Sequence, residues 1–327
     1  MSAVPTRAAR PAPAAAVLAF LQRPWVLAAL FAAALAAAVW SGSGYAPTII
    51  ARTAILALAA VSLSFLIGQA GLVSFGHAAP LGIGAYVVLI AGEYGVTNAL
   101  VLFPLGFAAA ALWSAGTGVI ALRTRGVYFI MITLAFAQML FYVAGSLSAF
   151  GGDDGLGIAA RSTFFGLRFL RTDTDLAMFA IAVLGIALLV LERLSAAPFG
   201  LMLRTGRANE LKLAALGLDP FVHRLLALAV AGGIAGLAGV LLANQVEYVS
   251  PATMNWHVSG ELIVMVVLGG TTRLGGAVLG AVVVMLIDET LGHFTEFWKL
   301  GLGLAILAAV LLRGADLGRL LRGAPHG

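Results

Sequence analysis

Long apolar runs recur along the chain and constrain its fold more than any other feature. About ten segments approach the ~20 residues that a helix needs to cross ~30 Å of hydrocarbon, although two are shorter. They are Pro24–Trp40, Thr48–Ile67, Leu72–Ala91, Asn98–Leu122, Val127–Phe150, Asp175–Leu191, Val222–Asn244, Ser259–Leu268, Leu274–Ile287 and Glu296–Leu312. This pattern predicts an all-α, polytopic transmembrane helical bundle.

Composition excludes a soluble globular domain and several kinds of site. Of the 327 residues, 61% are hydrophobic and 10% are charged, whereas soluble domains carry about 25% charged residues. The chain has no cysteine, which excludes disulfides and thiolate metal sites. Its lysines, Lys212 and Lys299, are each followed by leucine, so no P-loop for ATP is present. We expect no cofactor or metal on this chain, and no enzymatic activity, because no catalytic constellation is visible.

Charged residues are unevenly divided between the two sides of the membrane. If Ser195–Arg224 is cytoplasmic, the basic residues left outside are Arg52, Arg161, Arg168, Arg171 and Lys299. The acidic residues then left inside are Glu192, Glu210, Asp219 and Asp316. This bias predicts cytoplasmic tails at 1–23 and 314–327 and a transmembrane domain at 24–313. The net charge of +5 is therefore an orientation signal and does not indicate nucleic-acid binding. Because many spans follow, Pro24–Trp40 is interpreted as a retained helix rather than a signal peptide.

Ser195–Arg224 is a polar island between two apolar runs. Within it, Asn209–Leu216 is rich in helix formers. One face of that helix would carry the apolar residues Leu211, Ala214, Ala215 and Leu218. Gly217 stands where a helix end favours a left-handed residue, and Pro220 prevents continuation. The pattern predicts a short amphipathic helix, which must pack on its own membrane domain or on another protein to persist.

Two glycine-rich turns share one plan. Residues 67–86 read IGQAGLVSFGHAAPLGIGAY, and residues 268–281 read LGGTTRLGGAVLGA. In each, an apolar helix is expected to reach the cytoplasmic side, reverse at glycines and return as a helix. Non-helical backbone at membrane depth must be buried in protein or line a wet cavity, so both turns are placed inside the assembly. The glycines assigned to them are Gly68, Gly71, Gly76, Gly269, Gly270 and Gly275.

Polar side chains within apolar spans are costly and mark candidates for a translocation pathway. The candidates are Gln69, Ser74, His77, Thr133, Gln138, Ser259 and Glu261. For His77 a structural role, with a bond to a turn carbonyl, is favoured over substrate contact. Thr133 and Gln138 are equally compatible with hydrogen bonds between helices. Ser259 and Glu261 are placed at the outer end of their span, where Glu261 can simply meet water.

Two further features receive the simpler of two interpretations. The loop Gly151–Thr174 falls outside and is interpreted as a solvated connector rather than a lid or contact surface. The small residues Gly232, Gly236 and Gly239 allow close helix approach. Packing within the chain is favoured for them over contact between subunits.

Several motifs, in a consistent order, resemble those of permease subunits of ABC importers in the branched-chain amino acid group (LivM-type). LRTGRANELKLAALGL, residues 203–218, resembles their cytoplasmic coupling segment, and both glycine-rich turns resemble their counterparts. Residues 122–139, GGDDGLGI and residues 231–251 extend the resemblance over most of 63–281. The chain departs from the family pattern at Ala208, Leu213, Thr271 and Gly276.

The resemblance implies a subunit of an importer in the bacterial inner membrane, with both termini cytoplasmic. The implied partners are a second homologous (LivH-like) permease, two cytoplasmic ATPase subunits that bind ATP and Mg, and an external solute-binding protein. It assigns contact with the ATPases to a helix at 204–217, through Arg204, Arg207, Asn209, Glu210, Leu211, Ala214 and Gly217.

The substrate implied is a branched-chain amino acid, and urea, short amides or aromatic acids stay open because relatives carry them. A secondary transporter or channel without ATPases is the alternative from another class. It would need ionisable residues deep in the spans, and almost none are present. A purely structural membrane scaffold is disfavoured by the glycine-rich turns.

Overall fold

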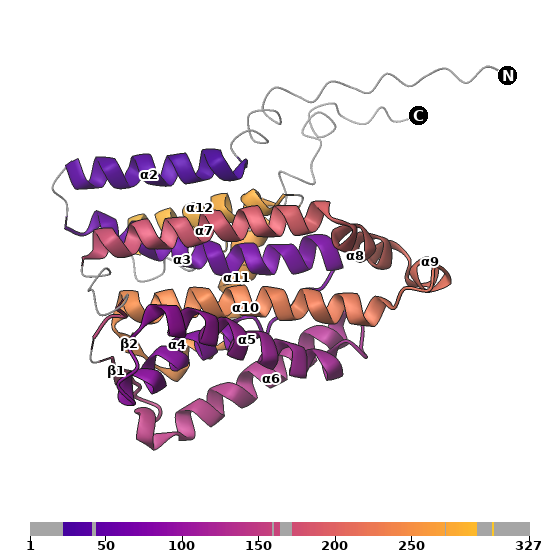
Figure 1. The fold of residues 1–327 in the computed structure, drawn as a ribbon, viewed down its shortest axis with the longest axis horizontal. Helices are drawn as coiled ribbons and strands as arrows, with labels where there is room; N and C mark the ends of the chain where they lie inside the picture. The colour runs from indigo at the N-terminus through magenta and orange to yellow at the C-terminus, as the bar shows by residue number, and fades with distance from the viewer. Residues whose placement is uncertain are drawn as a thin grey trace, which may run out of the picture.

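The computed structural model describes residues 22–40, 44–158, 160–163, 172–271, 273–292 and 303. Within these residues the chain is almost entirely helical, and most helices lie side by side along one direction (Figure 1). Those long and apolar enough to cross a membrane are α3 (Ala46–Phe65) with the π-helical turn η1 (Leu66–Ala70), α5 (Ala99–Ala121), α6 (Val127–Ser146), α7 (Asp173–Ala196), α10 (Pro220–Val246) and α12 (Leu274–Gly292). Shorter apolar helices are α2 (Pro24–Trp40), α4 (Ala78–Glu93) and α11 (Trp256–Gly269). The prediction of an all-α, polytopic helical fold is confirmed.

The predicted segments correspond to these helices, with bounds that mostly differ by a few residues. The segment predicted at Leu72–Ala91 begins too early, because residues 71–77 are not helical and α4 begins at Ala78. The one predicted at Val127–Phe150 ends as an α-helix at Ser146 and continues into the 3-10 turn η2 (Ser148–Phe150). The last segment, Glu296–Leu312, lies outside the described residues except for Gly303.

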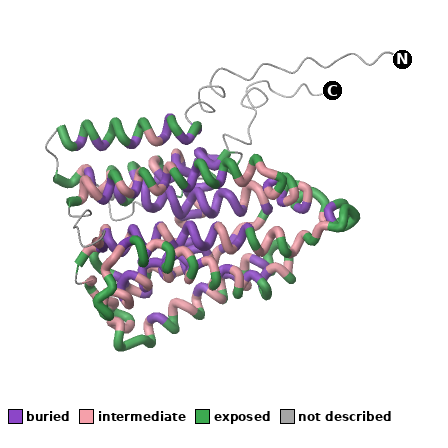
Figure 2. Tube along the Cα trace, viewed as in Figure 1, coloured by how far each residue is buried: buried purple, intermediate pink, exposed green. Residues whose placement is uncertain are grey.

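Helix α3 forms the centre of the bundle. Residues 53–66 of α3 and η1 are all buried, and Figure 2 shows α3 and much of α10 as the most buried tubes. Helix α3 packs against both α7 and α10, and it lies between them (Figure 1). By contrast, α6 lies at the edge of the bundle and exposes much of its surface.

Glycines allow α10 to pack closely against α4 and α5. A Cβ atom at Gly84 would overlap the carbonyl group of Gly236, and one at Gly239 would overlap the carbonyl of Leu81. A Cβ atom at Gly236 would lie 2.6 Å from the carbonyl oxygen of Gly106. Small residues that bring backbones together are the usual means of helix association in membranes. The interpretation of this glycine stripe as packing within the chain is therefore confirmed.

The two ends of the bundle differ. At one end, α8 (Pro198–Ala208) and α9 (Glu210–Ala215) form a projecting tip, and we call this the α8–α9 end (Figure 1). At the other, β1 (Leu156–Gly157) pairs antiparallel with β2 (Tyr248–Val249), and this is the β1–β2 end. The 3-10 turn η3 (Pro251–Met254) follows β2 and leads into α11.

The described part of the loop 151–174 is fixed to the bundle, so its interpretation as a solvated connector is wrong. The backbone N–H of Ser162 donates a 2.6 Å hydrogen bond to the side chain of Asn244, which is fully buried in α10. The backbone N–H of Thr163 donates to the carbonyl of Thr97 (2.7 Å). Through these bonds and the β1–β2 pairing, the described part of the loop pairs several backbone groups with α10, with the connection between α4 and α5 and with β2 rather than with water.

Candidate functional site

The polar island folds into two helices rather than one. Asn209 is extended (φ −160°, ψ 107°) and separates α8 from α9, and its side chain accepts a 3.3 Å hydrogen bond from the backbone N–H of Lys212. The prediction of one continuous helix over 204–217 is therefore wrong, because asparagine is more stable as an N-cap than inside a helix. Gly217 has φ +76° after α9, and α9 does not continue past it, as the sequence predicts; Pro220 is the first residue of α10.

The predicted apolar face of α9 is exposed on the surface of the chain. Leu213 is the buried residue of α9, and it lies against Gly206 of α8. Leu211 and Leu216 are 81% and 71% exposed. Ala214 and Ala215 are exposed as well, so this face does not pack on the chain's own membrane domain, and its packing on another protein stays a prediction. The projecting tip, green in Figure 2, therefore presents apolar side chains outward.

Two arginines attach α8 to the first glycine-rich turn. Arg207 donates through Nη1 to the carbonyl oxygens of Gly68 (2.6 Å) and Ile67 (3.2 Å). Arg204 donates through Nη1 to Oε1 of Gln69 (3.0 Å) and to the carbonyl of Ser195 (3.1 Å). Carbonyl groups at a helix end need such donors, so both arginines have a structural use here.

Glycine at position 71 allows this attachment. Gly71 ends η1 with φ +71°, and a Cβ atom there would lie 2.9 Å from Cγ of Arg207. Neither the left-handed backbone nor the close approach suits a side chain. The predicted turn glycine and the predicted coupling arginine thus lie in direct contact.

Glu210 joins the tip to two other segments. Its carboxylate forms ion pairs with Arg125, in the loop between α5 and α6, and with Arg224 of α10 (2.6 Å). Arg224 also donates to the carbonyl of Gly206 (3.1 Å). A pocket of about 220 Å³ lies between the first glycine-rich turn, this loop and the tip, with Arg207 and Glu210 in its wall.

The two glycine-rich turns lie next to each other. A Cβ atom at Gly68 would be 3.0 Å from the carbonyl oxygen of Thr271. In the second turn, Gly270 has φ +89°, and Gly269 and Gly276 approach so closely that neither has room for a side chain. The other assigned glycines are also crowded, Gly76 by the carbonyl of Thr133 and Gly275 by the carbonyl of Gln22.

A polar cluster surrounds the start of α4. Nε2 of the buried His77 lies 2.7 Å from Oγ of Ser62, so the partner of His77 is a hydroxyl and the predicted turn carbonyl is wrong. Ser259 is fully buried and accepts a 2.9 Å hydrogen bond from the backbone N–H of Ala78. Ser259 lies in the first turn of α11, near one end of its predicted span. Ser74 accepts from the backbone N–H of Gly76 (3.2 Å).

A small cavity of about 20 Å³ lies beside this cluster. Three of the predicted pathway residues line it: Ser74, His77 and Thr133. It is also lined by residues that the sequence reasoning missed, Trp113, Ser114 and Thr117 of α5. Ser114 and Thr117 are polar residues in an apolar span, so the criterion already applied to α6 would have found them.

The remaining pathway candidates lie apart from this cavity. Nε2 of Gln138 is buried, with no hydrogen-bond partner among the described residues. Glu261 is partly buried, and Gln69 belongs to the joint with Arg204 at the α8–α9 end. Of the candidates, Gln69 thus belongs to a joint at one end, Ser74, His77, Thr133 and Ser259 to the start of α4, and Gln138 and Glu261 to neither.

Comparisons with known proteins agree with this architecture. The family model for "branched-chain amino acid transport system / permease component" matches residues 45–312. A high-affinity branched-chain amino acid transport system permease protein LivM of Escherichia coli is 26% identical over 81% of this chain and 68% of its own length. The protein of the same name from Salmonella typhimurium is 27% identical over the same shares. A probable LivM of Methanocaldococcus jannaschii is 25% identical over 76% of this chain and 81% of its own. No solved structure gives a significant match.

Proposed function

The chain belongs to the family of branched-chain amino acid transport permease components, and from that premise we propose that it is the membrane-spanning subunit of an ATP-driven importer of branched-chain amino acids. The proposal places it in a bacterial inner membrane, with ten segments, helices broken at glycine turns and both termini cytoplasmic. A homologous permease, two ATPase subunits and an external solute-binding protein complete the importer. The α8–α9 end is the cytoplasmic end, in keeping with the arginines that gather there.

The observation that carries the proposal is the exposed apolar tip. Leu211 of α9 and Leu216 just after it face outward, while Arg207 and Glu210 attach the same tip to the bundle. Exposed apolar side chains beside charged residues are typical of a protein-binding surface. We assign contact with the ATPase to Leu211 and Ala214, and attachment of the tip to Arg204, Arg207 and Glu210.

The attachments suggest how force would reach the pathway. Displacement of the tip would move the first glycine-rich turn through Arg207 and the start of α10 through Glu210 and Arg224. The cavity at the start of α4, about 20 Å³, has room for about one water molecule. Passage of an amino acid therefore requires α4, α5, α6 and α10 to separate around it, as in other two-state transitions driven from a distant site.

Reconstitution tests the proposal. The chain would be assembled in proteoliposomes with the permease, ATPase and binding protein of its transport system, and uptake of labelled leucine would be measured with and without ATP. We expect uptake that requires both ATP and the binding protein. Uptake driven by an ion gradient without ATP would favour a secondary transporter and overturn the proposal.

A pair of variants tests the role of the tip. Leu211→Ser with Leu216→Ser should remove most ATPase that co-purifies with the chain, since it removes the apolar contact surface. Val96→Ser, which also replaces an exposed apolar residue with serine but at the β1–β2 end, should retain it. Equal ATPase recovery from both variants would contradict the assigned contact.

A further inference from the structure

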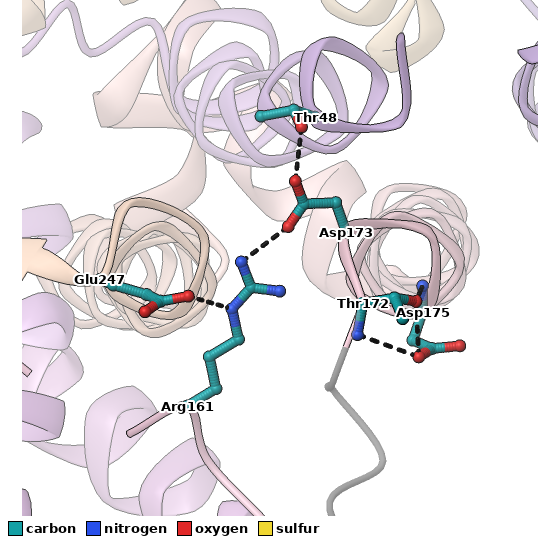
Figure 3. Close-up of polar contacts among 6 residues, drawn as sticks. All are labelled: Thr48, Arg161, Thr172, Asp173, Asp175 and Glu247. Carbon is teal, nitrogen blue, oxygen red and sulfur yellow. Dashed lines mark hydrogen bonds and ion pairs between the residues drawn. The ribbon is translucent and has the colours of Figure 1, made fainter. Parts of the chain in front are cut away.

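A single arginine joins three segments at the β1–β2 end of the bundle. Arg161, from the loop before α7, donates through Nη2 to Oδ1 of Asp173 and through Nε to Oε1 of Glu247, each at 2.6 Å. Asp173 also accepts a 2.6 Å hydrogen bond from the hydroxyl of Thr48 at the start of α3. Figure 3 shows the guanidinium between the two carboxylates, with Thr48 on the far side of Asp173.

The backbone at Glu247 is unusual. Among the described residues, Glu247 is the only one other than glycine with a positive φ (56°), and it directly follows the last residue of α10. Glycine is the residue that this left-handed position normally favours. A charged side chain that occupies a mildly strained position suggests a use for that side chain. Here the side chain holds Arg161.

The ion pairs are partly shielded from water. The Arg161 side chain is 18% exposed, whereas those of Asp173 and Glu247 are 35% and 50% exposed. Burial alone would lower the pKa of Arg161, but its bonds to Asp173 and Glu247 outweigh that effect and raise the pKa. The guanidinium therefore stays charged at any physiological pH and can bind both carboxylates at once, which a single lysine amine does less well.

The helices that Arg161 joins are the two that carry the α8–α9 tip. Helix α7 leads into α8, and α10 follows α9, so the tip connects their ends at one side of the membrane. Along the rest of their length, α3 lies between α7 and α10, and these two helices make little direct contact with each other. Asp173 and Glu247 lie at their opposite ends, where Arg161 is the shared partner of both.

We propose that Arg161 is a positioning residue for transport, which holds α7 and α10 together at the β1–β2 end so that displacement of the tip moves both helices as one unit. Without Arg161, a push on the tip would separate the two helices at the far end instead of tilting them together. The role in transport rests on the proposed function, whereas the joining of the helices does not.

The first experiment measures the distance between α7 and α10 at the β1–β2 end and does not depend on transport. The chain has no cysteine, so spin labels at Met178→Cys on α7 and Val246→Cys on α10, both exposed, report the distance between the helices in the full-length protein in lipid. We expect one narrow distance distribution in the parent chain and a clearly broader one with Arg161→Gln. Arg161→Lys should be intermediate. An unchanged distribution in Arg161→Gln overturns the proposal.

The second experiment measures coupling in the assembled importer. Arg161→Gln should lower the number of solute molecules imported per ATP hydrolysed by about fivefold or more, while the amount of assembled complex stays constant. The matched control is Arg52→Gln, which removes an exposed arginine of α3 for which the described residues give no bond. An unchanged ratio in Arg161→Gln counts against the transport role. If the parent complex itself does not import, the proposed function fails, and the spin-label result still decides whether Arg161 joins the helices.

Discussion

Arg207 of α8 donates a 2.6 Å hydrogen bond to the carbonyl oxygen of Gly68, which lies 139 residues earlier in the chain. The bond connects the projecting tip with the turn where α3 ends. Because Gly68 in turn lies against Thr271, the same contact leads on to the turn between α11 and α12. Three segments far apart in the sequence thus form one joint at the α8–α9 end.

A side chain at position 71 should disturb this joint. Gly71→Ala combines a left-handed backbone with a contact to the Arg207 side chain, so we expect a loss of stability of about 2 kcal/mol or more. Gly217→Ala is the matched control, because Gly217 also has a positive φ but an added Cβ would meet no atom within 4 Å. It should lose only about 1 kcal/mol. Thermal unfolding of the purified variants in detergent measures both, and equal losses would argue against a steric contact.

The two arginines bound to Glu210 should differ in strength. Arg125 is 80% exposed and Arg224 is 18% exposed. Solvent screens the first pair, so a double-mutant cycle of Arg125→Gln with Glu210→Gln should give less than about 0.5 kcal/mol. The cycle of Arg224→Gln with Glu210→Gln should give about 1 kcal/mol, because that pair is better shielded. A larger coupling energy for Arg125 would contradict this order.

Neighbouring serines of α3 should respond differently to the same substitution. Ser62→Ala removes the hydroxyl bonded to the buried His77, so we expect a loss of about 1–3 kcal/mol from the unpaired imidazole. The Ser64 hydroxyl is buried without a hydrogen-bond partner among the described residues, so Ser64→Ala should be neutral or slightly stabilising. Unfolding in detergent compares the two, and a cost at Ser64 equal to that at Ser62 would contradict the assigned bond.

The close packing of α4 on α10 predicts a further contrast. Gly84→Ala would force its Cβ against the carbonyl of Gly236, which should cost about 1–3 kcal/mol as the helices move apart. Gly92→Ala on the same helix meets no atom within 4 Å. It should be neutral or stabilise the chain by up to about 1 kcal/mol through helix propensity. If Gly84→Ala unfolds at the same temperature as Gly92→Ala, α4 and α10 do not pack as described.

Sequence periodicity was sufficient to predict local features. The apolar runs predicted the apolar helices of the bundle, and Gly217 with Pro220 predicted the end of α9. The predicted topology also put on the same side of the membrane residues that form ion pairs in the structure, such as Arg125 with Glu210 and Arg161 with Asp173. These features depend on chain length, hydropathy and backbone preference, which neighbouring residues set.

Which residues form hydrogen bonds or pack against one another could not be predicted, because this depends on contacts between segments that are distant in the sequence. The resemblance implied one helix over 204–217, yet the side chain of Asn209 caps a separate helix, and Leu213 rather than Leu211 then faces the bundle. His77 was expected to bond a carbonyl of its own turn, but α3 offers the hydroxyl of Ser62 at 2.7 Å.

The sequence by itself determined that this chain is a bundle of membrane-length helices with a polar, basic segment between α7 and α10. The tertiary structure alone decided that α3 lies between these two helices, and that Arg207 meets Gly68 at one end while Arg161 joins Asp173 to Glu247 at the other. The physical reason is that hydropathy fixes which residues enter the membrane, whereas the order of helices around a common centre depends on how closely their backbones can approach. That approach is set by pairs of residues such as Gly84 and Gly236, whose contact no local pattern encodes.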